Sequence, residues 1–106
     1  MNRRIIPGGL YRHYKNKWYF VIGEARHTET DEVFVSYFPL YGEDPVLYVR
    51  PKTMFLEAID PVNTNGLQKW RFLESDATEI DLKEKVELLH QSQVILHKMG
   101  LAIVED

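Results

Sequence analysis

Two runs of β-branched and aromatic residues around a polar segment dominate the hydrophobic pattern of the chain. The runs span residues 18–27 and 33–37, and residues 28–32 between them are polar. This arrangement predicts an antiparallel hairpin. Because side chains alternate between the faces of a strand, the odd-numbered residues of both runs are expected on one inward face. That set contains Tyr19, Val21, Gly23, Ala25, His27, Val33, Val35 and Tyr37.

The loop length decides the register of this hairpin. Both odd-numbered sets face inward only if the loop has an odd number of residues. A three-residue loop, Glu29–Asp31, meets that condition and pairs Ala25 with Val35 and Gly23 with Tyr37. Asp31 is expected at positive φ, as such loops require, and Gly23 is expected to leave room for the Tyr37 ring.

Other short runs extend the sheet. We predict strands at 10–14, 46–50, 56–60 and 68–73, a single helical turn at 51–55 and a tight turn at 63–66. An Asn-Gly pair marks that turn as a hairpin connection. The spacing is typical of a small barrel, so the predicted fold class is mainly β, with five to six antiparallel strands.

An amphipathic helix is predicted after residue 79, with Thr78 as its N-cap and Gly100 as its stop. Its apolar residues are Leu82, Val86, Leu88, Leu89, Ile95, Leu96 and Met99. They cover about half of the helix circumference, more than the ~100° that a surface helix needs. We expect this face to cover the second apolar face of the first hairpin strand. The surplus, with the tail at 101–104, leaves a homodimer through residues 79–104 as a further expectation.

Length and composition suit one soluble domain. We divide the 106 residues into a lead-in at 1–9, a β domain at 10–73, a linker at 74–78 and the helix with its tail at 79–106. The chain has no cysteine, which excludes disulfides, thiolate nucleophiles and thiolate metal sites. It has no apolar run approaching the ~20 residues of a membrane span and no signal-peptide core, so we expect a cytoplasmic protein without membrane contact.

The net charge of −3 conceals an asymmetry. Residues 1–27 carry six Lys or Arg against one acid. A basic surface of this kind could contact nucleic acid, although the overall sign opposes non-specific binding. A mixed, solvated surface explains the same composition.

Four motifs give the chain a resemblance to a known family. They are Gly9–Lys15, Gly23–Thr30, Leu40–Gly42 and Val49–Phe55. In this order they resemble a bacterial family of uncharacterised proteins, the domain of unknown function 1653 (DUF1653), over roughly residues 9–73. The resemblance implies a small SH3-like barrel and supplies no catalytic residues. The chain departs from the family in having Tyr48 where tryptophan is expected and Asp31 where glycine is common.

Polar side chains inside these motifs are the candidate ligand-binding residues. They are Arg12, His13, His27, Glu29, Tyr41 and Arg50. Arginine offers a forked donor suited to phosphate or carboxylate. His27 falls on the inward face, so we expect a partly buried core histidine, with a site role as the alternative. His13 lies among charged residues near a turn, where we expect it to be solvated.

Neither a metal nor a cofactor is predicted. His13, His27 and Glu29 could bind a metal only if the fold brought them together, because no His-x-x-x-His spacing occurs. A solvated helix face explains His90 and His97. Catalytic triad motifs and a Gly-rich phosphate loop are also missing from the sequence.

Three hypotheses about function follow. The favoured one is a non-enzymatic binding module that recognises an anionic or aromatic ligand, a peptide or a nucleic-acid element through loops around Arg12, His13, Tyr41 and Arg50. The tyrosines of the chain would supply both core and binding surface, with Tyr19 and Tyr37 expected in the core. The second is a small hydrolase or nucleotide-processing enzyme with His27 or His13 as general base beside an acid. The third is an assembly protein that dimerises through the C-terminal helix.

Overall fold

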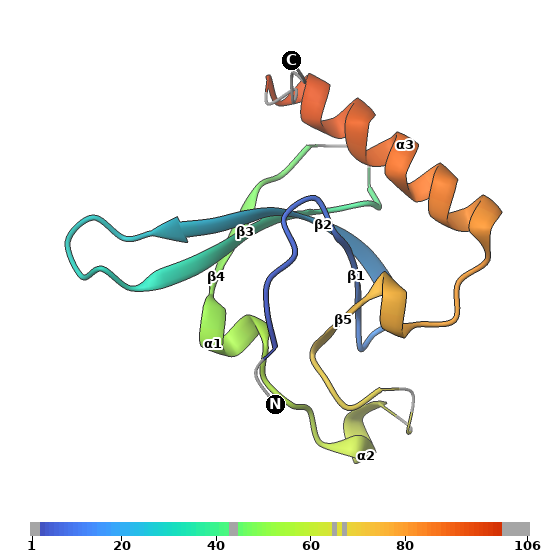
Figure 1. The fold of residues 1–106 in the computed structure, drawn as a ribbon, viewed down its shortest axis with the longest axis horizontal. Coiled ribbons are helices and arrows are strands. Elements are labelled where there is room, and N and C mark those ends of the chain that lie inside the picture. Colours follow the sequence, from blue (N-terminus) through green and yellow to red (C-terminus); the bar gives the residue numbers. More distant parts are fainter. Residues whose placement is uncertain (1–2, 43–44, 65, 67, 101–106) are drawn as a thin grey trace.

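A five-stranded antiparallel sheet forms the body of the computed structural model, which describes residues 3–42, 45–64, 66 and 68–100 (Figure 1). The strands are β1 (Leu10–His13), β2 (Lys17–Arg26), β3 (Val33–Pro39), β4 (Tyr48–Pro51) and β5 (Phe72–Glu74). Their order in the sheet is β4-β3-β2-β1-β5. The predicted class, mainly β with a C-terminal helix, is confirmed. The sheet is not closed into a barrel, because β4 and β5 form its two edges.

The central hairpin has the inward face that its pattern predicts. Val21 and Val35 are completely buried, and Tyr37 is nearly so. All three belong to one hydrophobic core. Asp31 takes a φ of +60°, as expected for the hairpin loop. The alternation of apolar residues therefore predicted the inner half of the hairpin correctly.

The predicted register of the hairpin is wrong. The loop has four residues rather than three, since the N–H of His27 donates to the carbonyl of Glu32 at 2.9 Å. Ala25 consequently lies opposite Phe34 instead of Val35. An even-numbered loop turns the β2 residues next to it to the face opposite the predicted one. Ala25 and His27 are therefore exposed.

A β-bulge between Val21 and Gly23 restores the predicted facing of the hairpin residues far from the loop. The extra residue in β2 places Val21 opposite Tyr37, so both side chains face the core. Gly23 lies opposite Ser36, whose hydroxyl donates to the Gly23 carbonyl at 3.1 Å. Gly23 therefore does not make room for the Tyr37 ring.

Each face of the sheet carries its own core. The core on the inner face contains Tyr11, Val21, Val35, Tyr37, Phe55 and Phe72. The core on the opposite, outer face contains Leu10, Phe20, Phe38, Ile95 and Leu96. Phe55 comes from a helical turn at the expected place after β4, and the last two residues of the outer core come from the C-terminal helix.

Short helices connect the later elements. They are α1 (Lys52–Phe55), α2 (Pro61–Thr64) and η1 (Ser75–Ala77). The two strands predicted at 56–60 and 68–73 form only a short antiparallel contact, in which the Ile59 N–H donates to the Lys69 carbonyl at 2.7 Å. β5 starts late within the second of these segments and pairs with β1 instead. Asn65 of the predicted turn lies outside the described residues.

The C-terminal helix, α3 (Leu82–Lys98), begins later than predicted. Its N-cap is Asp81, whose carboxylate accepts the N–H of Glu84 at 2.8 Å. Thr78 instead donates its hydroxyl to the Ser75 carbonyl and ends η1. Gly100, with φ +72°, follows the last turn as expected, because this conformation suits glycine.

Asp81→Ala is expected to destabilise the protein by about 1 kcal/mol, the usual effect of losing an N-cap acceptor. Urea unfolding followed by circular dichroism at 222 nm measures this change. Glu79→Ala, two residues before the cap, serves as the control. Equal stability of the Asp81 variant and wild type would contradict the assignment of the cap.

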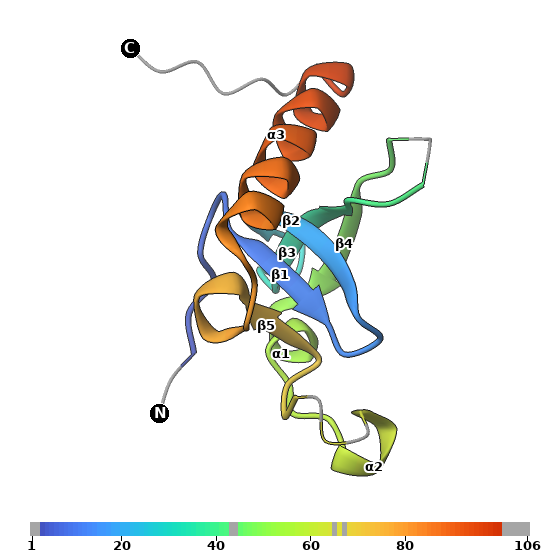
Figure 2. The ribbon, with the colours of Figure 1, turned by 90° about the vertical axis from the view of Figure 1, so that its right-hand side faces the viewer.

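α3 lies across the outer face of the sheet (Figure 2). Ile95 and Leu96 are buried there, with Leu88 and Met99 packed beside them. The predicted surplus of apolar surface is present as a stripe of Leu82, Val86 and Leu89, which are 76, 56 and 37 % exposed. Pairing of this stripe with a second subunit stays a prediction, and the tail at 101–104 lies outside the described residues. None of the helices described is long and apolar enough to cross a membrane.

Candidate functional site

Aromatic rings and cationic side chains gather on the inner face, at the end of the sheet near the β1–β2 turn. We define the aromatic–cationic cluster as His13, Lys17, Tyr19, Tyr37, Tyr41, Tyr48, Arg50 and Phe72. Strand pairing positions its members, since Tyr37 lies opposite Tyr48 and His13 opposite Phe72. Side chains at directly opposed positions share a face of the sheet.

Tyr19 is the centre of this cluster. Its ring centroid lies 5.6 Å from those of Tyr37 and Tyr41 and 5.5 Å from that of Phe72, each at a steep angle. The His13 ring lies 4.9 Å from Phe72 on the same side. These edge-to-face distances are in the favourable range for aromatic pairs. The rings therefore form one continuous aromatic surface.

Part of this surface is open to solvent. Tyr41 and Tyr48 are 43 and 42 % exposed, whereas Tyr37 and Phe72 beneath them are buried. The Tyr19 and Tyr41 hydroxyl oxygens are hydrogen-bonded at 2.6 Å. Burial, followed by this hydrogen bond, raises the pKa of Tyr19, so its phenol stays neutral at physiological pH. The exposed rings thus rest on buried, uncharged aromatic rings.

Two cations lie against the rings. The Lys17 Nζ is 4.4 Å from the centroid of the Tyr41 ring, and the Arg50 guanidinium carbon is 5.9 Å from that of Phe72. Arg50 also donates its Nε N–H to the Tyr37 hydroxyl at 3.2 Å. Five ion pairs occur within the described residues, and none includes Lys17 or Arg50. Within that part of the chain, neither cation has a carboxylate partner.

His13 has a lowered pKa, mainly because its ring is partly buried. Burial, and then the charges of Arg71, Arg50 and Lys15, lower the pKa of His13 from its ordinary 6.5 to about 4. The ring is half-buried rather than solvated, which corrects the expectation from the sequence. Its Nδ1 accepts the Lys15 N–H at 3.1 Å, so the proton of the neutral ring is assigned to Nε2. His13 can thus donate one hydrogen bond at neutral pH.

Of the predicted site residues, His13, Tyr41 and Arg50 come together in the cluster. Arg12 does not, because alternation along β1 directs it to the other face of the sheet from His13. Its Nε N–H donates to the Gln68 side-chain oxygen at 3.1 Å. The buried Gln68 amide in turn donates to the Arg12 carbonyl at 3.1 Å. Arg12 has a structural role in joining β1 to the segment before β5.

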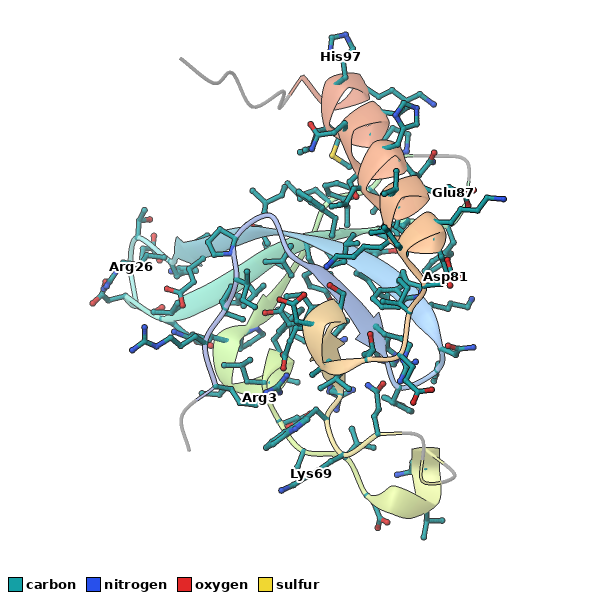
Figure 3. The ribbon with its side chains drawn as sticks, turned by 45° about the vertical axis from the view of Figure 1, so that its right-hand side comes forward. Arg3, Arg26, Lys69, Asp81, Glu87 and His97 are labelled. Atoms are coloured by element: carbon teal, nitrogen blue, oxygen red, sulfur yellow. The ribbon has the colours of Figure 1, made fainter. Side chains whose placement is uncertain are left out.

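His27 and Glu29 lie at the tip of the β2–β3 hairpin, which Arg26 marks in Figure 3. His27 is exposed rather than partly buried, because the loop reversed its face. Its Nδ1 accepts the N–H groups of Glu29 at 3.2 Å and Thr30 at 3.3 Å. β2 separates these residues from His13, so the three do not form a metal site. Within the residues that the structure describes, neither imidazole has the carboxylate partner that the enzyme hypothesis requires.

The sequence did not single out several members of the cluster. Tyr19 was assigned to the core, although its spacing from Tyr37 on the hairpin already placed both on one face. Lys17 has no local feature that distinguishes it from other surface lysines. Phe72 reaches the site only through the pairing of β5 with β1, which joins residues about sixty positions apart and leaves no local signal.

Comparison with known proteins agrees with the resemblance seen in the motifs. The family described as protein of unknown function DUF1653 matches residues 9–74. A crystal structure of a DUF1653 protein from Bordetella bronchiseptica is 32 % identical to this chain, with a TM-score of 0.57. The similarity covers 72 % of this chain and 95 % of the other. No curated protein matches the sequence. The match over most of the β-sheet region and the similar solved structure show that this chain belongs to the DUF1653 family.

Proposed function

We propose that the chain is a binding module for single-stranded nucleic acid, with bases stacked on the aromatic–cationic cluster and phosphates contacting its cations. The two exposed tyrosines, Tyr41 and Tyr48, offer ring surface to planar bases. Lys17 and Arg50 lie at the same surface and supply positive charge. Aromatic platforms combined with a basic groove are the usual means of holding a single strand.

The observation that carries this proposal is the presence of two cationic side chains at an aromatic surface. Aromatic rings by themselves would also accept a cationic ligand. Here Lys17 already lies over Tyr41, and the Arg50 guanidinium carbon lies 5.9 Å from the centroid of the Phe72 ring. A cationic ligand would be repelled, whereas a phosphate would be attracted. The chain as a whole has a net charge of −3, which opposes non-specific attraction of nucleic acid.

Simple binding fits the side chains better than catalysis. The Tyr19 phenol is held neutral by its buried position, and the Nδ1 of His13 is occupied by the Lys15 N–H. A general base needs a free acceptor poised near the operating pH. The groups of the cluster that remain open are mostly donors and cations, which suits recognition of phosphate oxygens.

The test is fluorescence anisotropy of a labelled twelve-nucleotide oligouridylate and of the corresponding oligodeoxythymidylate at low salt. Lys17→Gln is expected to weaken binding about fivefold and to reduce the dependence of log K on log salt by about 0.7, the value for one phosphate contact on a single strand. Tyr48→Ser is expected to weaken binding by a similar factor through lost stacking.

Lys69→Gln is the matched control, because Lys69 also lies over an aromatic ring, 4.9 Å from the centroid of Trp70, but away from the cluster beside α2 (Figure 3). It is expected to bind like wild type. Equal losses in the Lys17 and Lys69 variants would remove the cluster as the site. Failure of wild type to bind either oligonucleotide, with binding of an acidic peptide instead, would replace nucleic acid by a peptide ligand.

A further inference from the structure

The two edges of the sheet differ in how far they are covered. β5 lies at one edge, where its Phe72 carbonyl accepts a hydrogen bond from the guanidinium of Arg3 at 2.6 Å. Arg3 also forms an ion pair with Glu74 at 3.3 Å, so the N-terminal segment occupies this edge. β4 lies at the opposite edge. Within the described residues, β3 is the only segment that hydrogen-bonds to the backbone of Tyr48 and Val49.

The open edge at β4 is apolar. Its exposed apolar residues are Val46, Leu47, Tyr48 and Val49. Arg50 is the single charged residue between positions 45 and 51. Edge strands that must stay alone are usually protected by lysine, proline or a bulge, because their unpaired backbone groups are a template for another strand. β4 carries neither a lysine nor a bulge, and its proline, Pro51, ends the strand.

The backbone of Val49 faces the open side of β4. Pro51 lies opposite Phe34 and has no N–H, so its nitrogen faces away from β3. Because backbone groups alternate in direction along a strand, Val49, two residues earlier, turns its N–H and C=O to the same side. The edge therefore offers hydrogen bonds to a further strand at Val49.

We propose that β4 pairs antiparallel with β4 of a second copy of the chain, with Val49 opposite its counterpart on a two-fold axis. In this register Arg50 lies opposite Tyr48 of the second copy, and the same contact occurs twice. A guanidinium beside a tyrosine ring is a favourable cation–π pair. A register centred on Arg50 would place two like charges opposite each other, which is destabilising. Pairing at Val49 therefore gives the one charge of this edge an attractive partner.

The occupied edge of β5 decides the symmetry of the pairing. Pairing of β4 with β5 of another copy would be heterologous and would continue into a ring or a filament. Arg3 occupies the β5 edge, whereas pairing of β4 with itself closes after two copies. The two-fold axis is perpendicular to the joined sheet, so the aromatic–cationic clusters of both copies lie on one face. This inference goes beyond the proposed function and does not depend on it.

The dimer is expected to be weak. Contacts along one short edge bury less than the roughly 1,200 Å² at which interfaces of standard size begin. Wild type is therefore expected to shift from monomer to dimer as its concentration rises. Sedimentation velocity between about 10 µM and about 1 mM covers the dissociation constants of such weak complexes.

Charges placed on the axis provide the test. Val49 is 62 % exposed, so a polar residue is tolerated there. Val49→Lys and Val49→Glu each bring two like charges together and are expected to stay monomeric. An equimolar mixture of the two variants brings lysine opposite glutamate and is expected to restore the dimer. Val62→Lys, at another exposed valine, is the matched control and should associate like wild type. Circular dichroism confirms that the variants are folded.

The outcomes separate self-pairing of β4 from other arrangements. Monomeric single variants with a dimeric mixture support the proposal, because only a position that faces itself responds in this way. Wild type that stays monomeric over the whole range leaves the edge to a strand of a different protein and overturns the proposal. A mixture that stays monomeric contradicts the register at Val49. If Val86→Lys on the exposed stripe of α3 is monomeric while Val49→Lys remains dimeric, the copies meet through α3 and the proposal fails.

Discussion

Phe72→Ala is expected to lower the free energy of unfolding by about 3–5 kcal/mol, the usual loss for a fully buried phenylalanine. Phe72 is 1 % exposed and stacks on Phe55 with ring centroids 4.1 Å apart and planes 4° from parallel. It also contacts Tyr19 and Tyr37 edge-on. Removing the ring leaves a cavity among aromatic side chains that the short β5 and the single turn of α1 close only partly.

Urea unfolding measures this loss. A domain of this size has a total stability of about 5–15 kcal/mol, so the variant should lose a third or more of it and unfold at a clearly lower urea concentration. Val62→Ala, at a position 81 % exposed in α2, is the control and should change stability by less than about 0.5 kcal/mol. A loss below about 1 kcal/mol for Phe72→Ala would show that β5 does not close the inner core.

His13 is expected to make stability fall as the pH is lowered from about 6.5 to about 4. The folded pKa of His13 is lowered to about 4, whereas the unfolded chain has the ordinary value of 6.5. Above pH 6.5 the ring is neutral in both states and contributes nothing to the dependence on pH. Between the two values the unfolded state binds a proton that the folded state does not, so folding becomes less favourable.

The size of this effect follows from the shift and its screening. The whole shift corresponds to about 3 kcal/mol. Because the ring is only half-buried, solvent screens the charges around it, and we expect about 1–2 kcal/mol. The groups acting on His13 are Arg71 before β5, Arg50 on β4 and Lys15 in the β1–β2 turn. Arg71 is itself ion-paired with Glu57.

His13→Asn separates this contribution from the titration of carboxylates. The asparagine oxygen can accept the Lys15 N–H in place of Nδ1, so the turn is retained without a titrating ring. The free energy of unfolding of both proteins is measured with urea between pH 4 and 7.5. Above pH 6.5 it should depend on pH in the same way for wild type and variant. Below it, wild type should lose more stability than the variant. Parallel curves over the whole range would show that His13 titrates normally in the folded protein.

Local pattern was sufficient for most elements. Alternation predicted the inward positions of Val21, Val35 and Tyr37, and the helical period predicted that α3 would cover the sheet with Ile95 and Leu96. The polar segment at 28–32 is compatible with a loop of three or of four residues. The alternation therefore did not predict the loop length, nor the bulge in β2 that accompanies it. The bulge and the even loop together decided that His27 is exposed.

For the candidate site, too, the sequence predicted some members and not their arrangement. Composition and motifs drew attention to Tyr41, Arg50 and His13, since these are polar or aromatic residues within the family motifs. They did not indicate that Arg12, next to His13 in the sequence, lies on the opposite face of the sheet and donates a hydrogen bond to Gln68. Side chains of neighbouring residues on a strand point to opposite faces of the sheet, so a site residue can be followed directly by a structural one.

By itself the sequence determined the first four strands, the C-terminal helix, the inward face of the central hairpin and the family to which the chain belongs. These follow from periodicity and from local motifs, which act over a few residues. The tertiary structure alone decided that β5 pairs with β1, that Phe72 lies beneath His13 and that Lys17 covers Tyr41. Such contacts join distant segments through packing, and packing energy depends on the complete arrangement of side chains rather than on any stretch of the chain.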